Sequence, residues 1–116
     1  MAAAPFRIRR EAADGAPVLV PEGGIDLASA PMLGAALRKE LAARPAHLIV
    51  DLSDVEHLDS TGLAILLNAG RRLTRAGGRL SVVAADGAPR RILETSGVLE
   101  TLNVAPSRSL ALARSR

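Results

Sequence analysis

The residues best suited to chemistry lie together in the middle of the chain, in the segment Asp51-Leu-Ser-Asp-Val-Glu-His-Leu-Asp-Ser-Thr-Gly-Leu63. Four carboxylates, two serines, a threonine and a glycine stand here between an apolar run and a segment with helical periodicity. Functional groups of α/β proteins gather at such strand-to-helix connections, where the first N–H groups of the helix have no intrahelical acceptor. Asp, Ser and Thr before a helix are also ordinary N-cap residues, so the residue types alone favour capping.

Metal and thiol chemistry find no support in the sequence. The chain has no cysteine, which excludes disulfides, thiolate metal ligands and cysteine nucleophiles. His47 and His57 are ten positions apart, and no third ligand stands at a spacing typical of metal sites. The sequence therefore predicts no metal site.

Motifs of known enzyme classes are also missing from the sequence. It contains neither GxxxxGKS/T nor GxGxxG, and Ser60 does not lie in a GxSxG elbow. The pairs Asp54/Glu56 and Asp26/Asp59 have the groups needed for acid–base catalysis. A chain of 116 residues with so few polar clusters, however, offers no evident substrate pocket. We expect a protein that is not an enzyme and holds no cofactor.

The elements that position the central segment follow from hydrophobic periodicity. Strands are expected at residues 6–10 and 18–20, joined by a turn at 14–17, and the glycines and proline of residues 21–24 are expected to break or bend the chain.

A first helix is expected to start at Ser29, with Pro31 in its first turn, and to end at Pro45. Its apolar stripe recurs every four residues, at Leu33, Leu37 and Leu41. Glu40 and Arg44 have the i,i+4 spacing of an ion pair on the outer side of the helix.

Residues 47–52 are nearly all apolar in the middle, which is typical of a strand covered on both faces. A short connection, 53–59, then leads to a second helix that starts near Ser60 or Thr61 and is closed by the glycines that follow it. Its expected buried face is Leu63, Leu66, Leu67, Gly70 and Leu73.

The last part of the chain repeats this alternation. A strand is expected at 80–84, a third helix capped by Asp86, a short strand at 102–104, and a final helix from Ser107 to about Arg114.

Strands that alternate with helices predict an α/β fold, here a mixed sheet of four to five strands flanked by about four helices. Hydrophobic residues make up 48% of the chain, which is enough for a real core. We expect a single domain over residues 1–116, with its core at about 6–104 and a short C-terminal helix or tail at 106–116.

The basic character of the chain does not indicate nucleic-acid binding. A net charge of +3 gives a high isoelectric point because Lys39 is the only lysine and arginine keeps its charge to very high pH. The basic residues are spread along the chain with carboxylates between them, and Phe6 is the only aromatic residue available to stack on bases. No apolar run is long enough to span a membrane and no signal peptide is evident, so we expect no membrane insertion and a cytoplasmic location.

Several segments together resemble the STAS-domain anti-sigma factor antagonists. Asp51-Leu-Ser-Asp-Val and Leu58-Asp-Ser-Thr-Gly-Leu are similar to the core signature of that family. Gly77-Gly-Arg-Leu and Leu93-Glu-Thr-Ser-Gly-Val are similar to its later landmarks. Gly24-Ile-Asp keeps only part of the family's Gly-Glu-Leu-Asp pattern. The resemblance covers roughly residues 18–104 and implies the STAS fold.

This resemblance also implies a function. In the family, the serine directly after the aspartate is phosphorylated by a partner kinase that is also the anti-sigma factor; here that serine is Ser60, with Thr61 as the alternative acceptor. The unphosphorylated protein binds the anti-sigma factor and frees the sigma factor, and a metal-dependent serine phosphatase restores the serine. ATP and Mg²⁺ belong to the kinase, so no cofactor is expected on this chain.

Physical chemistry is consistent with such a switch. A hydroxyl at a helix N-terminus is exposed, and a phosphate there is expected to find free N–H groups and a favourable dipole. Phosphorylation adds a charge of about −1.5 to −2, and Asp26 and Asp59 are expected to add to the negative field. The predicted partner-binding residues are Asp26, Asp59, Ser60, Thr61, Ala64, Ile65, Asn68, Arg71 and Arg72, on or beside the outer face of the second helix.

Three other functions remain open at this point. The first is a STAS-type adaptor that is not phosphorylated and serves a transporter or a stress-signalling complex. The second is a small-ligand or nucleotide binder that uses the same helix N-terminus, which the missing phosphate loop disfavours. The third is nucleic-acid binding, which rests on the isoelectric point alone.

Overall fold

The computed structural model describes residues 5–114, which form one five-stranded mixed sheet with helices on both faces. The strands are β1 (Arg7–Ala13), β2 (Ala16–Ile25), β3 (His47–Asp51), β4 (Val55–Leu58) and β5 (Arg79–Val83). Their order is β1-β2-β3-β5, and β4 pairs with the last residues of β2. β1 and β2 are antiparallel, and all other pairs are parallel.

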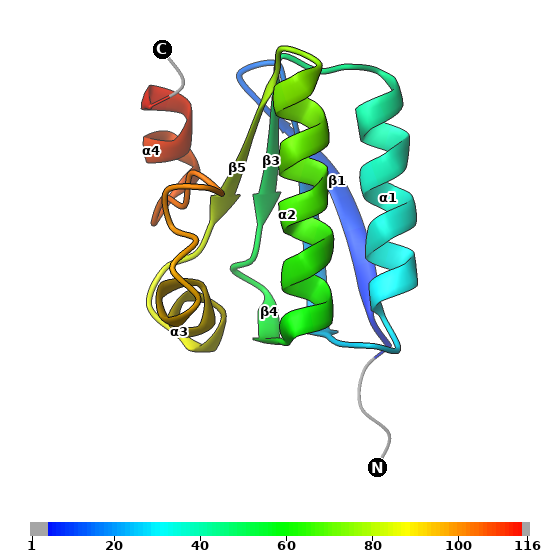
Figure 1. The fold of residues 1–116 in the computed structure, drawn as a ribbon, viewed down its shortest axis with the longest axis vertical. Coiled ribbons are helices and arrows are strands. Elements are labelled where there is room, and N and C mark those ends of the chain that lie inside the picture. Colours follow the sequence, from blue (N-terminus) through cyan, green and yellow to red (C-terminus); the bar gives the residue numbers. More distant parts are fainter. Residues whose placement is uncertain (1–4, 115–116) are drawn as a thin grey trace.

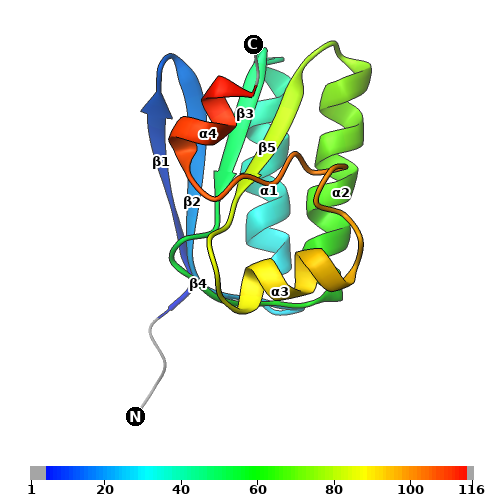
Figure 2. The ribbon, with the colours of Figure 1, turned by 90° about the vertical axis from the view of Figure 1, so that its left-hand side faces the viewer.

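The helices are α1 (Ala30–Ala42), α2 (Ser60–Arg75), α3 (Ala88–Thr95) and α4 (Arg108–Ala113). α1 and α2 lie side by side and parallel on one face of the sheet, both starting at the end where β2 and β4 finish (Figure 1). α4 lies on the opposite face (Figure 2). The expected α/β class, number of strands and number of helices are therefore confirmed.

The alternating direction of the strand side chains explains why helices pack on both faces of the sheet. Leu19 and Val50 belong to the large core beneath α1 and α2, whereas Val18 and Ile49 belong to a smaller core that includes Ala111 of α4. Successive strand side chains point to opposite faces, so a run of consecutive apolar residues requires helices on both sides.

The turn between β1 and β2 lies where the sequence predicts it. Asp14 and Gly15 are both left-handed, with φ of 49° and 82°. Two consecutive left-handed residues form the type I′ turn that matches the twist of a hairpin.

β2 is longer than expected, because the segment 21–24 bends the strand without ending it. Pro21 and Glu22 still pair with β1, and Gly23, Gly24 and Ile25 pair with β4 across an irregularity in the register. Gly23 has a φ of 103°, which only glycine adopts at low cost. Of the two outcomes expected for this segment, the chain is bent and not broken, because pairing on both sides of the strand outweighs its local preference.

The expected connection at 53–59 contains a strand that the sequence analysis missed. β4 covers four residues, and its two outer residues, Val55 and Leu58, are buried. Such a short strand is stabilised by its pairing with β2, a contact that local periodicity does not reveal.

α1 starts as predicted after Ser29 but ends at Ala42, and Arg44 follows in a left-handed conformation with φ of 48°. Glu40 is not on the outer side. It is 6% exposed and binds the guanidinium of Arg10 on β1 through both carboxylate oxygens, at 2.8 and 3.1 Å. The predicted Glu40–Arg44 pair is thus replaced by an ion pair between helix and sheet.

The C-terminal part departs from the prediction at two places. Asp86 does not cap α3, whose N-cap is Gly87. Residues 102–104 form no strand, because Asn103 is left-handed with φ of 49°, and only a single bridge joins Ala105 to β5. Ser107 caps α4 as expected, its hydroxyl accepting from the N–H of Leu110 at 3.2 Å.

α2 begins at Ser60 and buries most of the predicted face. Leu63, Leu66 and Leu73 are buried, but Leu67 and Gly70 are only partly buried. Gly62 and Ala69 take their places among the buried residues of the helix.

Candidate functional site

The candidate site lies where two neighbouring parallel strands finish. Ile25, the last residue of β2, is in register with Leu58, the last residue of β4. Asp26 and Asp59 directly follow these two residues, and the backbone N–H of Asp59 donates to the Ile25 carbonyl at 3.0 Å. The sheet therefore brings together two carboxylates that are 33 positions apart in sequence.

Asp59 is the N-cap of α2. Its backbone is extended, and its Oδ1 accepts from the N–H of Thr61 at 2.9 Å and from that of Gly62 at 3.1 Å. The next N–H, that of Leu63, donates to the Asp59 carbonyl at 3.0 Å. The capping interpretation therefore applies to Asp59, which accepts from the N–H groups of Thr61, Gly62 and Leu63 without any contribution from the Ser60 hydroxyl.

Ser60 is the first residue of α2 and is exposed. Within residues 5–114 its hydroxyl has no hydrogen-bond partner. A primary hydroxyl that is exposed and unpaired, on a rigid helix start, is accessible to a modifying enzyme. Thr61, the alternative acceptor, is partly buried.

The expectation that a phosphate at this position finds free N–H groups is contradicted for two of them. The N–H groups of Thr61 and Gly62 are not free, because the Asp59 carboxylate already accepts from both. A phosphate on Ser60 must either displace this cap or remain in solvent beside it. In both cases it adds negative charge next to a carboxylate.

Gly62 allows α2 to start this close to the sheet. A Cβ on Gly62 would overlap the side chains of Ile25 and Leu58. The glycine of the Asp-Ser-Thr-Gly sequence thus fixes how closely the helix start, and with it Ser60, approaches the ends of β2 and β4.

Asp26 caps the loop before α1. Its Oδ1 accepts from the N–H groups of Ala28 at 3.0 Å and Ser29 at 3.1 Å, and its Oδ2 lies 3.4 Å from Nε2 of His57 on β4. The hydrogen bond from Ser29, followed by the contact with His57, holds the pKa of the Asp26 carboxyl below its ordinary value. Asp26 is therefore a second fixed negative charge at this end of the sheet.

Comparison with known proteins identifies the family. Residues 7–111 match the STAS domain. The chain belongs to the STAS domain family. It is 35% identical over 91 residues to the anti-sigma-F factor antagonist RsfB of Mycobacterium tuberculosis, with 78% of this chain and 74% of RsfB aligned.

Solved structures agree with this assignment. The crystal structure of an anti-sigma factor antagonist from Mycobacterium paratuberculosis is 35% identical, with a TM-score of 0.88, and the match covers 97% of this STAS domain and 95% of that chain. The unphosphorylated form of the anti-sigma factor antagonist SpoIIAA shares the fold at 18% identity, with a TM-score of 0.68 over 95% of each chain.

The predicted docking face of the STAS domain is only partly one surface. Ala64 and Asn68 are exposed on the same side of α2, and Ile65 and Arg72 line the groove between α2 and α1. Arg71 instead lines a separate hollow on the other flank of α2, together with Thr101. Arg71, eleven positions after Ser60, points within about 20° of Ser60 around the helix axis, whereas Arg72 is turned by about 120°, toward α1.

Two exposed apolar residues beside the site were missed by the sequence analysis. Leu27, directly after Asp26, is 76% exposed, and Met32 in the first turn of α1 is 52% exposed. The signal in the sequence was the position of Met32, one residue before the buried stripe that starts at Leu33. An apolar residue at that position points away from the core, and exposed apolar residues that lie together are typical of protein-binding surfaces.

Other kinds of site find no counterpart in the described part of the chain. Residues 5–114 contain no group of three or more His, Asp or Glu side chains placed to hold a metal ion. Among the same residues, no helix is both long and apolar enough to cross a bilayer.

Proposed function

We propose that this STAS domain is an anti-sigma factor antagonist that is switched by phosphorylation of Ser60. The unphosphorylated protein binds an anti-sigma factor with serine-kinase activity and so releases a sigma factor. Phosphorylation by that kinase ends the binding, and a metal-dependent serine phosphatase reverses it. The protein acts in the cytoplasm as a binding partner and not as an enzyme; ATP and Mg²⁺ are held by the kinase.

The observation that carries this proposal is the free hydroxyl of Ser60 next to a capping carboxylate. Because the Asp59 side chain supplies the cap of α2, modification of the Ser60 hydroxyl breaks no hydrogen bond among residues 5–114. The relatives at 35% identity are named anti-sigma factor antagonists, which supports the assignment of the partner.

The surroundings of Ser60 suggest how the switch works. Leu27 and Met32 supply apolar contact area, and Asp26 and Asp59 supply charge beside it. A phosphate adds about −1.5 to −2 charges to this cluster. The phosphate also adds bulk, so a partner surface that fits the unmodified site is blocked sterically and, where it is acidic, is repelled by the added charge.

The test begins with the cognate anti-sigma factor, isolated by co-purification from the native cell extract. Incubated with that protein and Mg-ATP, the STAS domain gains one phosphate, which mass spectrometry locates on Ser60. Ser60→Ala gains none and keeps its affinity for the partner, and Thr61→Ala is modified like the parent. Phosphate on Thr61 or on another serine would refute the residue assignment.

Binding measurements complete the test. Phosphorylated protein and Ser60→Asp both bind the anti-sigma factor more weakly than the parent, the phosphoprotein by the larger factor because it carries more charge. A protein that is never phosphorylated and co-purifies with transporter or stress-complex subunits would instead support the adaptor function.

A further inference from the structure

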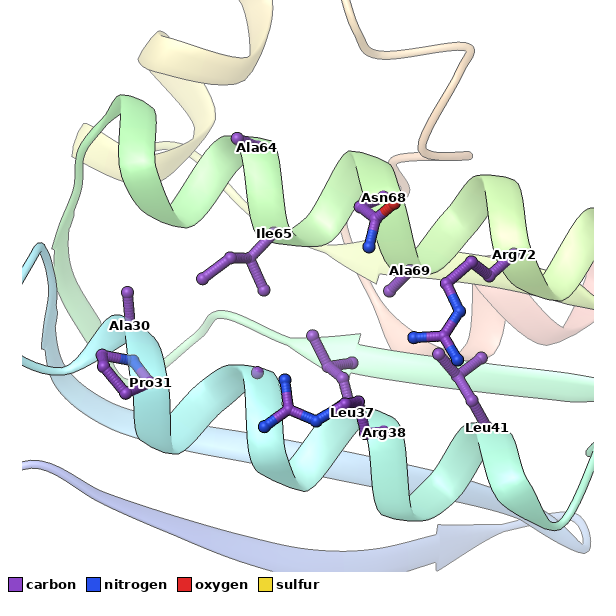
Figure 3. A pocket seen from close by; sticks show the side chains of 11 residues that line it. Ala30, Pro31, Leu37, Arg38, Leu41, Ala64, Ile65, Asn68, Ala69 and Arg72 are labelled. Atoms are coloured by element: carbon purple, nitrogen blue, oxygen red, sulfur yellow. The ribbon is translucent and has the colours of Figure 1, made fainter.

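A groove runs between α1 and α2 and starts at the end of the layer that carries Ser60. Its volume is about 250 Å³. Ala30 and Ala64 lie at its start, and Leu41 and Arg72 lie at its far end, as Figure 3 shows.

Small residues of both helices line the groove and leave it open. They include Gly34 of α1 and Ala69 of α2, while Leu37 and Ile65 give the groove apolar walls. Glycine inside a helix costs up to about 1 kcal/mol relative to alanine. The helical backbone at Gly34 does not require glycine, since its φ is not positive. The effect of this glycine is therefore to leave room in the groove for other atoms.

Two arginines extend over this apolar floor from opposite sides. Figure 3 shows the side chains of Arg38, from α1, and Arg72, from α2, both directed into the groove. A Cβ on Gly34 would lie 3.3 Å from Nη1 of Arg38, so the missing side chain lets this guanidinium lie along α1.

Neither groove arginine has a hydrogen-bond or ion-pair partner within residues 5–114. Five other arginines of the fold form ion pairs with carboxylates, namely Arg7, Arg9, Arg10, Arg90 and Arg108, so Arg38 and Arg72 belong to the arginines whose charge no carboxylate of the described residues neutralises. A guanidinium presents donors in a fork that matches a carboxylate. Two such forks, one on each side of an apolar floor, complement an apolar strip flanked by carboxylates.

We infer that this groove binds an acidic amphipathic segment of the anti-sigma factor, an inference that rests on the proposed function and adds the chemistry of the contact. Apolar side chains of the segment cover Leu37 and Ile65, and its carboxylates pair with Arg38 and Arg72. The groove begins at Ala64, about one helical turn after Ser60, so one partner reaches both.

A second copy of this chain fits the groove poorly. α2 contains no acidic residue, and the only one in α1 is Glu40, which is buried and already bound to Arg10. A dimer whose two-fold axis passes beside Arg38 and Arg72 would therefore place arginine against arginine. Like charges that face each other across an interface are unfavourable.

Charge reversal at the groove is the first test. Arg38→Glu and Arg72→Glu each weaken binding of the unphosphorylated protein to the anti-sigma factor about tenfold or more, and the loss shrinks as salt is added. The matched controls are Lys39→Glu on α1 and Arg75→Glu on α2, exposed cations that do not line the groove. These change affinity less than about threefold. Thermal melts establish that all four variants are folded.

Cross-linking is the second test. A benzophenone photocrosslinker in place of Asn68, at the rim of the groove, captures the bound anti-sigma factor, and mass spectrometry identifies the captured segment. We expect apolar residues with Asp or Glu beside them. Capture of a segment without acidic residues would overturn the inference.

The outcomes separate this inference from the proposed function. If Ser60→Asp weakens binding while Arg38→Glu and Arg72→Glu bind like the parent, the groove assignment is wrong and the switch stands. If no anti-sigma factor binds the parent protein, both are wrong. A parent that is dimeric in sedimentation, and that either groove variant makes monomeric, would assign the groove to a second copy and refute the inference.

Discussion

Substitutions at Asp59 and Ser60 are expected to separate the cap of α2 from its switch. Asp59→Ala removes the acceptor of two N–H groups, at 2.9 and 3.1 Å, and the loss of such an N-cap costs about 0.5–2 kcal/mol. In a domain of this size, 1 kcal/mol corresponds to about 3–5 °C in Tm. Ser60→Ala removes a hydroxyl that makes no hydrogen bond within residues 5–114, so its free energy of unfolding is expected to stay within about 0.5 kcal/mol of the parent.

Thermal and urea unfolding of both variants measure this difference. Asp59→Asn is the matched control, because asparagine caps a helix about as well as aspartate and gives up only the interaction of charge with the helix dipole, about 0.3–1 kcal/mol. The expected order of stability is Ser60→Ala close to the parent, then Asp59→Asn, then Asp59→Ala. If Ser60→Ala is as unstable as Asp59→Ala, the hydroxyl has a structural role, and the reasoning that leaves it free for modification fails.

Three further substitutions test features of the fold. Gly62→Ala forces a methyl group into the ends of β2 and β4 and should lower the free energy of unfolding by about 1–3 kcal/mol in urea titrations, whereas a neutral result would contradict the close approach of α2. Gly34→Ala should instead raise Tm, because alanine gains up to about 1 kcal/mol in helix propensity and meets only the flexible end of Arg38; a large loss of stability would show that the groove is tighter than described. Hydrogen bonds from Ser53 and Arg108 outweigh the effect of burial and hold the pKa of Asp51 below its ordinary value, so its stabilising contribution is present above about pH 3.9 and is lost below it. In Arg108→Met the pKa of Asp51 should move back toward or above its unfolded value, so the variant is less stable at pH 7 but loses less of its stability on acidification than the parent, which urea midpoints between pH 3 and 7 measure; an unchanged acid profile would exclude this ion pair as the cause.

Local signals in the sequence were sufficient to place Ser60, the proposed switch, at the start of a helix. Ser60 was expected at the start of a helix, and the cap, the apolar periodicity and the preceding buried strand are all encoded within about fifteen residues. Short-range patterns of this kind determine where a helix begins. What they did not determine is which of two neighbouring polar residues makes the cap, because Asp59 and Ser60 are both good N-cap residues.

The features that sequence reasoning missed depend on contacts between distant residues. Glu40 is buried because Arg10, thirty positions earlier, supplies a partner for its charge. β4 is a strand because β2 offers an open edge beside it. The groove between α1 and α2 also depends on how the two helices pack, and neither Arg38 nor Arg72 stands out in the sequence from the other arginines.

The carboxylates and the groove arginines lie toward opposite ends of the α1/α2 layer, which gives this face of the molecule an electric moment along the helices. Asp26 and Asp59 stand where the helices start, and Arg38 and Arg72 lie in their second halves. A charged partner exerts a torque on such a body while the two are still separated, and so turns it before they touch. Because salt screens interactions beyond about 10 Å at 0.1 M, ionic strength acts mainly on the rate of productive encounter. A phosphate on Ser60 enlarges the moment, so modification changes the orientation in which the protein is approached as well as the strength of the final contact.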